Sequence, residues 1–445
     1  MSNPEPATSL LDSQATEVGS VFVSNYPPYS FWSETAVPEV HRVLGEPPRP
    51  NTPLGLYLHI PFCRKRCKFC YFRVYTDKNA SQVEEYIGAV VREARLYAEQ
   101  AALSQRPVNF VYFGGGTPSF ISVKHLKQLV EQVQEVFPWD QVEEVAFECE
   151  PGTLTRSKLE AIKEIGVTRL SLGVEHFDDE ILRENGRAHV SKEIYRVLPW
   201  ITDLGFDQLN IDLIAGLVGE TWDSWRGAID KTLEVSPDSV TIYQLELPYN
   251  TVYSKSKLAG DEGPSVADWQ TKRQWQAYAM ERLGEEGYEV SSAYTMVKKK
   301  QAGSRPFVYR DALWQGADLL PLGVSSFGHL SGVHFQNLSG WTPYLNAVGE
   351  GELPISRAFV TTADERLTRE MILQLKRGYL LAAPFQEKFG VDIRERFAEP
   401  FGALRESGLL KEEQDHLRLS PEGLLRVDQL LPAFYDVKYQ GARYT

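Results

Sequence analysis

Three cysteines stand within eight residues, as Cys63-x3-Cys67-x2-Cys70, and the fourth cysteine, Cys149, lies far from them. Thiolates are the usual ligands of iron–sulfur clusters, and a [4Fe–4S] cluster is normally held by four of them. Three ligands would leave one iron open, which is what a metal needs to bind a substrate. Zinc would require a fourth Cys or His at motif spacing, and none lies nearby. We therefore predict an iron–sulfur cluster on the three clustered cysteines, with Cys149 as a small buried residue or part of a pocket wall.

Basic residues occupy most of the positions between these cysteines: Arg64, Lys65, Arg66 and Lys68. Neighbouring positive charge lowers the pKa of a thiol and favours the thiolate that binds metal. It would also offset the negative charge of a bound cluster. We therefore expect a locally basic site in a chain whose overall balance is acidic.

The composition excludes several classes of protein. The 445 residues carry 47 Lys and Arg against 60 Asp and Glu, a formal net charge of −13. Four cysteines in so long a chain do not make a disulfide framework. Nucleic-acid binding requires a Lys/Arg surplus, and no apolar run approaches the ~20 residues that span a bilayer. The first basic residue is Arg42, so the N-terminus does not read as a targeting signal. We expect a cytoplasmic protein with a small-molecule substrate, no nucleic acid and no membrane span.

The elements that must position the cysteine loop follow a regular rhythm from residue 54. β-rich runs are expected at residues 56–60, 109–113, 145–148, 169–174, 208–214 and 240–245. Helical patterns between them include residues 83–101, 123–136, 157–165 and 222–233. Strands that alternate with helices predict an α/β fold with a parallel sheet. Six such units predict a partial (β/α)6 TIM-like barrel, whose active site lies at the carboxyl ends of the strands.

Chemistry-bearing residues follow or end several of these runs. The cysteine loop follows the first run, and the glycine-rich turn Gly114-Gly-Gly-Thr-Pro118 follows the second. Such a turn lets backbone groups approach a ligand closely. Glu148 ends the third run and Asp212 lies within the fifth, where a carboxylate among apolar residues needs a partner. Gln244 and Glu246, after the sixth run, are further candidate pocket residues.

The rest of the chain is expected to add smaller parts to this barrel. From residue 361, helix, helix, a short β-ribbon and a last helix resemble a winged-helix-like α+β module, and residues 291–311 look irregular. A structural cap is favoured over DNA binding, because no basic recognition helix is present. The predicted parts are a disordered tail (1–23), an N-terminal extension packing on the barrel (24–53), the catalytic barrel (54–290), an irregular and β-rich extension (291–360) and a helical winged-helix-like domain (361–445).

The cysteine motif, Tyr57-Leu-His-Ile-Pro-Phe-Cys63-x3-Cys67-x-Phe-Cys70, resembles that of the radical S-adenosylmethionine (SAM) superfamily. More narrowly, the chain resembles the oxygen-independent coproporphyrinogen III oxidase (coproporphyrinogen dehydrogenase) family and its relatives. Further motifs carry this resemblance over about residues 24–430: Asn25-Tyr-Pro-Pro28, Phe113-Gly-Gly-Gly-Thr-Pro-Ser119, Phe147-Glu-Cys-Glu-Pro151, Arg169-Leu-Ser-Leu-Gly-Val-Glu-His-Phe177, Asn185-Gly-Arg187, Asn210-Ile-Asp-Leu-Ile-Ala-Gly216 and Gly323-Val-Ser-Ser326.

The resemblance implies a radical SAM barrel in which the open iron of a [4Fe–4S] cluster chelates SAM. Reduction of the cluster would break the C5′–S bond of SAM, and the 5′-deoxyadenosyl radical would take hydrogen from an unactivated carbon. The cofactor carries this chemistry, and the protein orients it. The resemblance also implies an electron donor such as flavodoxin or ferredoxin, and it makes a tetrapyrrole a candidate substrate.

Cofactor-binding positions are implied residue by residue. Those for the cluster-bound SAM are Tyr57, Phe69, Gly115, Gly116, Thr117 and Glu148. Those for a second SAM, which relatives can hold near the first, are Gly116, Thr117, Glu175, Arg187 and Asp212. Glu175 departs from the family, where Gln is common at this position. Glu adds a negative charge and loses two hydrogen-bond donors.

The reaction is left open between three branches of the family. Coproporphyrinogen oxidases carry Gly-Cys after the third cluster cysteine, where this chain has Tyr71-Phe72. Haem chaperones often carry His-Asn-x-x-Tyr-Trp, where this chain has Tyr309-Arg-Asp-Ala-Leu-Trp314. Three alternatives therefore stay open: porphyrinogen oxidation, radical C-methylation with two SAM molecules, and haem chaperoning. Side chains left as either structural or pocket residues are His176, His189, His329, His334, Lys298–Lys300, Arg305 and Arg310.

Overall fold

A twelve-stranded sheet forms the centre of the computed structural model, which describes residues 15–139, 141–260, 265–299 and 306–442. Six of its strands run parallel in sequence order: β1 (Leu54–Ile60), β2 (Phe110–Gly115), β3 (Glu144–Cys149), β4 (Arg169–Glu175), β5 (Gln208–Ala215) and β6 (Ser239–Gln244). Each begins and ends within two residues of its predicted position. Both faces of β1 are buried apart from the half-buried Tyr57, as expected in a parallel sheet.

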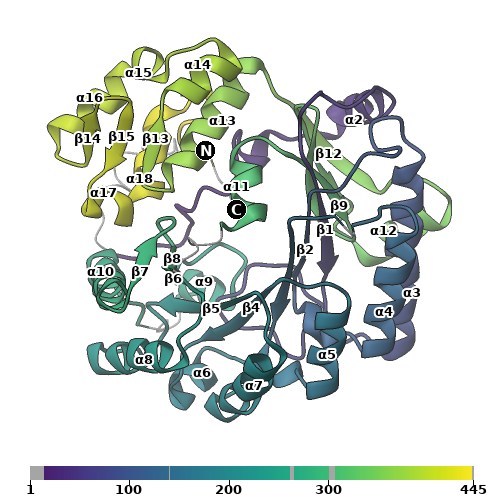
Figure 1. Cartoon of the computed structure of the whole chain (residues 1–445), viewed down its shortest axis with the longest axis horizontal. Helices are drawn as coiled ribbons and strands as arrows, with labels where there is room; N and C mark the ends of the chain where they lie inside the picture. The colour runs from purple at the N-terminus through teal and green to yellow at the C-terminus, as the bar shows by residue number, and fades with distance from the viewer. Residues whose placement is uncertain (1–14, 140, 261–264, 300–305, 443–445) are drawn as a thin grey trace.

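Helices between these strands cover the outer face of the sheet (Figure 1). They are α3 (Ala80–Ala98), α4 (Val123–Gln134), α5 (Arg156–Glu164), α6 (Asp179–Glu184), α7 (Ser191–Leu204) and α8 (Trp222–Val235), and α10 (Trp269–Glu285) follows β6. The side chains of Asn79, Ser122, Thr155 and Thr221 accept backbone N–H groups and start α3, α4, α5 and α8. Such caps fix where each βα loop ends, and therefore hold the loops that carry chemistry.

The sheet extends beyond the six parallel strands at both edges. Next to β1 lies the parallel strand β9 (Asp318–Leu322), followed by β10 (Phe327–Leu330), β11 (Val333–Asn337) and β12 (Ile355–Val360) in antiparallel order. Next to β6 lie β8 (Thr295–Lys298) and β7 (Tyr288–Val290), also antiparallel. The two outer strands of the sheet do not pair with each other. The barrel is therefore partial, as predicted, and it is open on one side.

The expected irregular stretch over residues 291–311 is partly wrong. It contains β8, and α11 (Val308–Trp314) begins within it. β8 forms because it pairs with the distant β6, a tertiary contact that local sequence does not encode. The extension that follows also contains a helix, α12 (Trp341–Gly349), which packs against α3.

The C-terminal part is a smaller α+β module with its own apolar core, at the upper left of Figure 1. Its helices are α13 (Ala363–Leu375), α14 (Ala383–Phe389), α15 (Ile393–Arg396), α16 (Ala398–Glu406), α17 (Pro421–Leu425) and α18 (Val427–Leu430). Its antiparallel ribbon is formed by β13 (Tyr379–Leu381), β15 (His416–Leu419) and β14 (Leu410–Glu413). This is the winged-helix-like module that the sequence predicts.

Residues 15–23 contradict the expectation of a disordered tail, whose first fourteen positions lie outside the described residues. The Thr16 hydroxyl donates to the Ala267 carbonyl, and the buried Val23 packs in the core of the C-terminal module. The ammonium of Lys272 donates to Thr16 Oγ1 at 2.8 Å, and that of Lys376 donates to the Val23 carbonyl at 2.5 Å. This N-terminal segment therefore crosses between the barrel and the C-terminal module.

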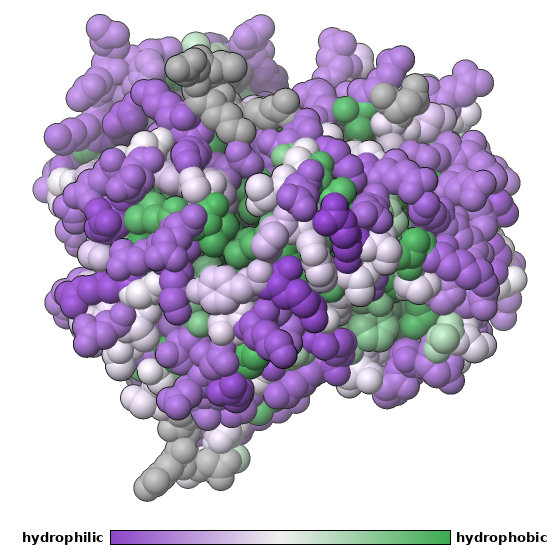
Figure 2. All heavy atoms as spheres, turned by 60° about the horizontal axis from the view of Figure 1, so that its bottom comes forward, coloured by the Kyte–Doolittle hydropathy of each residue, from purple (hydrophilic) through white to green (hydrophobic). Residues whose placement is uncertain are grey.

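The described residues also contain two further α-helices, α2 (Val37–Leu44), which packs on β12, and α9 (Val252–Leu258), as well as short 3-10 helices. In the part of the chain that the structure describes, every helix is too short or too polar to cross a membrane. The face in Figure 2 is mostly hydrophilic, and hydrophobic residues gather in hollows between polar ridges.

Candidate active site

One cavity of about 1200 Å³ opens at the carboxyl ends of the parallel strands. It is lined by all twelve cluster and cofactor residues that the sequence points to: Tyr57, Cys63, Cys67, Phe69, Cys70, Gly115, Gly116, Thr117, Glu148, Glu175, Arg187 and Asp212. Single-ligand pockets usually measure about 300–1,000 Å³. This cavity therefore has room for more than one small molecule.

The three clustered cysteines are half-buried and come from the loop after β1. The Cys63 thiol lies 3.3 Å from the Thr117 hydroxyl, and Arg187 donates from Nη1 to Cys67 Sγ at 3.4 Å. The loop is held by backbone bonds, including one from the Cys63 N–H to the Tyr75 carbonyl. Cys149 is buried at the end of β3 and forms part of the cavity wall.

For two of the cysteines, burial outweighs the neighbouring positive charge that was expected to favour the thiolate. Burial raises the pKa of Cys63 to about 11 and that of Cys70 to about 12, and the nearby guanidinium groups offset only part of this. Lys68 is engaged elsewhere, in an ion pair with Glu184 at 2.9 Å. A bound metal would therefore have to displace protons from these thiols.

The donor set, three cysteine thiols on one loop beside the cavity, fits an iron–sulfur cluster by its chemistry. Nε of Arg187 and Nε2 of His59 are among the buried atoms on this cavity that have no hydrogen-bond partner within the described residues. Buried polar groups normally have partners, so a polar ligand would complete this site.

The glycine-rich turn after β2 leaves no space for side chains. A Cβ on Gly115 would lie 2.6 Å from the His59 ring, and Gly115 has a φ of +113°. A Cβ on Gly116 would lie 2.9 Å from the Phe62 carbonyl oxygen. The backbone of this turn therefore comes close to the cysteine loop and faces the cavity directly.

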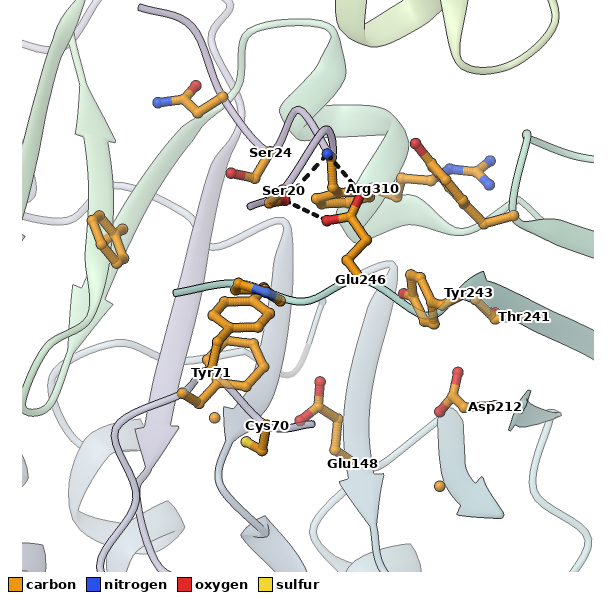
Figure 3. A pocket seen from close by; sticks show the side chains of 18 of the residues that line it. Ser20, Ser24, Cys70, Tyr71, Glu148, Asp212, Thr241, Tyr243, Glu246 and Arg310 are labelled. Carbon is orange, nitrogen blue, oxygen red and sulfur yellow. Dashed lines mark hydrogen bonds between the residues drawn. The ribbon is translucent and has the colours of Figure 1, made fainter. Parts of the chain in front are cut away.

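Three carboxylates line the cavity from adjacent strands, and in Figure 3 Glu148 and Asp212 point into it from their strand ends. Tyr112 donates its hydroxyl to Glu148 at 2.7 Å, and burial raises the pKa of Glu148 to about 7. Ser171 donates to Asp212 at 2.7 Å, and burial raises the pKa of Asp212. Glu175, whose φ is +65°, lies 3.5 Å from Arg187, and burial raises its pKa to about 7.

The two predicted aromatic residues have different neighbours. The Tyr57 ring stacks on that of Tyr112 at 6.0 Å, and its hydroxyl lies 3.3 Å from His59 Nδ1. Phe69 packs on an apolar cluster that includes Ile181 and Leu245. Both rings are part of the cavity wall.

Some of the remaining candidate residues pair with other side chains inside the fold, and others line the cavity. His176 pairs with the buried Glu220, and His189 pairs with Glu150. We therefore assign these two histidines a structural role. Cavity positions among the remaining candidates are His329, His334, Gln244, Glu246 and Arg310. Lys298 and Lys299 are not on the cavity wall, and Lys300 and Arg305 lie outside the described residues.

Sequence reasoning singled out Glu246 but missed the N-terminal segment and Tyr243 as parts of the cavity wall. Glu246 accepts the backbone N–H groups of Val21 and Phe22 at 3.1 Å, as well as the Ser20 hydroxyl (Figure 3). This brings the N-terminal segment into the cavity wall, and its polar composition gave no signal of that. Tyr243 was also missed, although it lies within the predicted run over residues 240–245 and directly precedes Gln244.

Comparisons with known proteins agree with this geometry. The sequence model of the Radical SAM superfamily matches residues 57–232, and that of the HemN C-terminal domain matches residues 361–426. The chain is 27% identical to the oxygen-independent coproporphyrinogen III oxidase of Synechocystis, over 86% of this chain and 85% of that protein. It is also 27% identical to the heme chaperone HemW of Bacillus subtilis, over 85% of this chain and 98% of that protein.

A solved structure shares the fold across almost the whole chain. Coproporphyrinogen III oxidase (HemN) from Escherichia coli, a radical SAM enzyme, superimposes with a TM-score of 0.79 and 23% identity, covering 93% of this chain and 96% of that one. The radical SAM match implies a [4Fe–4S] cluster and SAM. The chain therefore carries a radical SAM domain and a HemN C-terminal domain, is similar in sequence to oxygen-independent coproporphyrinogen III oxidases, and shares the fold of HemN.

Proposed function

We propose that the protein cleaves SAM reductively and uses the resulting radical on a carboxylate-bearing tetrapyrrole. The observation that carries this proposal is the meeting of three cysteines, a glycine-rich turn and three strand-end carboxylates on one cavity. When bound, the cluster and SAM would supply a 5′-deoxyadenosyl radical that takes a hydrogen atom from the substrate. We propose that Cys63, Cys67 and Cys70 hold the cluster.

The residues of the chain would hold SAM by charge and by backbone contact. SAM carries a sulfonium and an ammonium group, and Glu148 offers a carboxylate to the ammonium or to the ribose hydroxyls. Gly115, Gly116 and Thr117 offer backbone groups to the methionine part. Tyr57 and Phe69 would limit the access of water to this region.

A second SAM is part of this proposal. Glu175 and Asp212 lie on neighbouring strands and present carboxylates to one region of the cavity. Arg187 is held there by the Gly173 carbonyl at 2.7 Å and would pair with the carboxylate of a methionine moiety. Gly116 and Thr117 border the same space. Glu175 would add an attraction for a cationic ligand that Gln does not provide.

The substrate class rests on the relatives and on the cavity together. Both relatives compared above act on or carry tetrapyrroles by name, and the cavity is larger than SAM alone requires. The electron would come from a low-potential protein such as flavodoxin or ferredoxin. We also propose a cytoplasmic location, because free cysteines persist in a reducing compartment.

Haem handling is the second candidate function. The chain matches 98% of the length of a heme chaperone, and the same cavity could hold haem in place of a substrate. This alternative makes a distinct prediction, because haem would bind stoichiometrically without being changed.

The test is an anaerobic assay of the protein with its reconstituted cluster, SAM, dithionite and coproporphyrinogen III. The proposal predicts 5′-deoxyadenosine and a changed tetrapyrrole. S-adenosylhomocysteine together with a methylated product would replace this proposal by methyl transfer. In a parallel sample with haem in place of coproporphyrinogen III, stoichiometric binding of unchanged haem, with no 5′-deoxyadenosine in either sample, would replace it by the chaperone function.

A further inference from the structure

Tyr71 and Phe72 form an aromatic pair beside the cysteine loop. Their ring centroids lie 4.4 Å apart at an interplanar angle of 29°, so the rings are stacked. Both line the cavity, yet 36% of Tyr71 and 44% of Phe72 remain exposed. They directly follow Cys70, and in Figure 3 the Tyr71 ring rises from beside Cys70 into the cavity. An apolar surface is thus presented next to the proposed cluster.

The loop that carries this pair is fixed by residues that follow β6. Asn250 donates from Nδ2 to the Tyr71 carbonyl at 2.6 Å. Arg66 donates from Nη2 to the carbonyls of Cys70 and Asn250, each at 3.2 Å. The pair is therefore held in place before any ligand binds, which reduces the entropy cost of binding.

A third aromatic face lies across the cavity. Tyr243 is 42% exposed, lines the cavity and stacks at 25° on Tyr294. Figure 3 shows Tyr71 and Tyr243 on different sides of the same space. Exposed rings on two sides of a cavity favour a ligand with a broad apolar face.

The same loop also carries two positively charged side chains. Lys65 and Arg73 are exposed, line the cavity and have no ion pair or hydrogen bond with any other described residue. Arg73 directly follows Phe72. Carboxylates on the ligand could therefore pair with these two side chains while its ring system lies on the aromatic pair.

We propose that Tyr71 and Phe72 are a stacking platform for a flat, fully conjugated tetrapyrrole carboxylate. The choice of a tetrapyrrole rests on the proposed function; the preference for a flat one rests on the platform. A flat conjugated macrocycle can continue the stack on the outer face of the pair with its extended ring system. A porphyrinogen is puckered at its four sp3 bridge carbons and offers one pyrrole at a time. The platform therefore selects the oxidised ring system over the reduced one.

The test is a fluorescence titration of the anaerobic, cluster-loaded protein with coproporphyrin III. We expect the double variant Tyr71→Leu/Phe72→Leu to bind this porphyrin roughly tenfold more weakly, because it keeps apolar bulk and loses two stacking faces. The variant Tyr71→Phe/Phe72→Tyr keeps both faces and should bind as the unchanged protein does. Tyr195→Leu is the matched control, because Tyr195 is 45% exposed on α7 and lies off the cavity.

Coproporphyrinogen III, measured by competition against the fluorescent probe under reducing conditions, should bind several-fold more weakly than the porphyrin. The inference is overturned if the Leu/Leu variant binds as tightly as the Tyr195→Leu control, if the porphyrinogen binds more tightly, or if the unchanged protein binds no porphyrin. The proposed function is tested separately, by measuring whether 5′-deoxyadenosine forms from SAM. Porphyrin binding through the platform without SAM cleavage would contradict that function and support this inference.

Discussion

At the scale of single residues, burial outweighs neighbouring charge in this site. Glu148 receives a hydrogen bond from Tyr112, which lowers its pKa, but burial still raises that pKa to about 7. The same balance raises the pKa of Cys63 although Arg187 lies nearby. Groups whose pKa values are strongly shifted by burial and by specific neighbours are typical of functional sites.

The raised pKa of Glu148 predicts a pH dependence of SAM binding. Below about pH 7 the group is protonated and neutral; as pH rises from 6 to 8 it becomes a carboxylate, so the affinity for cationic SAM should rise. Glu148→Gln should flatten this profile and weaken binding about tenfold, because hydrogen bonds to charged groups contribute about 1.5–3 kcal/mol. Isothermal titration with SAM at several pH values measures both effects.

Glu143→Gln is the control for this prediction, because Glu143 is exposed just before β3, at the far end of that strand from Glu148. It should bind SAM with the profile of the unchanged protein. An unaltered pH profile in Glu148→Gln would remove Glu148 from the SAM site.

At the scale of elements, the turn after β9 fastens the sheet to the helices behind it. Gly323 has a φ of +105°, and its N–H donates to the buried Glu93 of α3 at 2.7 Å. Glu93 also accepts the Tyr344 hydroxyl of α12 and the Asn337 amide of β11. One carboxylate thus ties together α3, α12, β11 and the turn after β9, the strand that pairs with β1.

Gly323→Ala should destabilise the protein strongly. The new Cβ would lie 2.3 Å from Tyr86 Oη and 2.9 Å from the His59 carbonyl oxygen, at a φ that side chains rarely adopt. Overpacking and backbone strain each cost about 1–3 kcal/mol, so we expect a loss of roughly 3 kcal/mol in the free energy of unfolding. Chemical denaturation followed by circular dichroism measures it.

Gly227→Ala provides the matched comparison within α8. A Cβ there meets nothing within 4 Å, and replacing a helix-interior Gly by Ala should stabilise by about 0.5–1 kcal/mol. Equal unfolding midpoints for the two variants would show that the turn at Gly323 is not constrained as described.

The elements differ in whether the sequence alone could predict them. The six parallel strands could be predicted because each is a short buried run followed by a polar cap and a helical pattern. β8 and the N-terminal segment could not, because their partners, β6 and Glu246, are distant in sequence. The candidate site residues were brought to one cavity by strand order, which the βα rhythm implies. The exposure of Tyr71 and Tyr243 depends on the finished cavity, so no local pattern signals it.

At the scale of the whole molecule, the N-terminal segment joins the two larger parts. Glu246 follows β6 of the barrel and accepts N–H groups from Val21 and Phe22. Asp428 of the C-terminal module accepts the Val23 N–H at 2.9 Å and pairs with Lys376 at 2.7 Å. The segment therefore borders the cavity and depends on both parts for its position.

Removing the Glu246 carboxylate should release this segment. Glu246→Ala leaves two backbone N–H groups and the Ser20 hydroxyl without their acceptor, so we expect limited proteolysis within residues 15–24 to quicken several-fold. Glu387→Ala, at an exposed position on α14, should be cut at the rate of the unchanged protein. Equal cleavage rates in the two variants, read by mass spectrometry, would contradict this role for Glu246.

The central claim is that three cysteines, and not the fourth, hold the cluster. Its most direct test is the iron and sulfide content of the anaerobically reconstituted protein, together with the electron paramagnetic resonance signal of the reduced cluster. We predict about four iron atoms per chain in the unchanged protein and in Cys149→Ala, and a loss of the [4Fe–4S] signal in each of Cys63→Ala, Cys67→Ala and Cys70→Ala. Full iron content and an unchanged signal in any of those three variants would contradict the account.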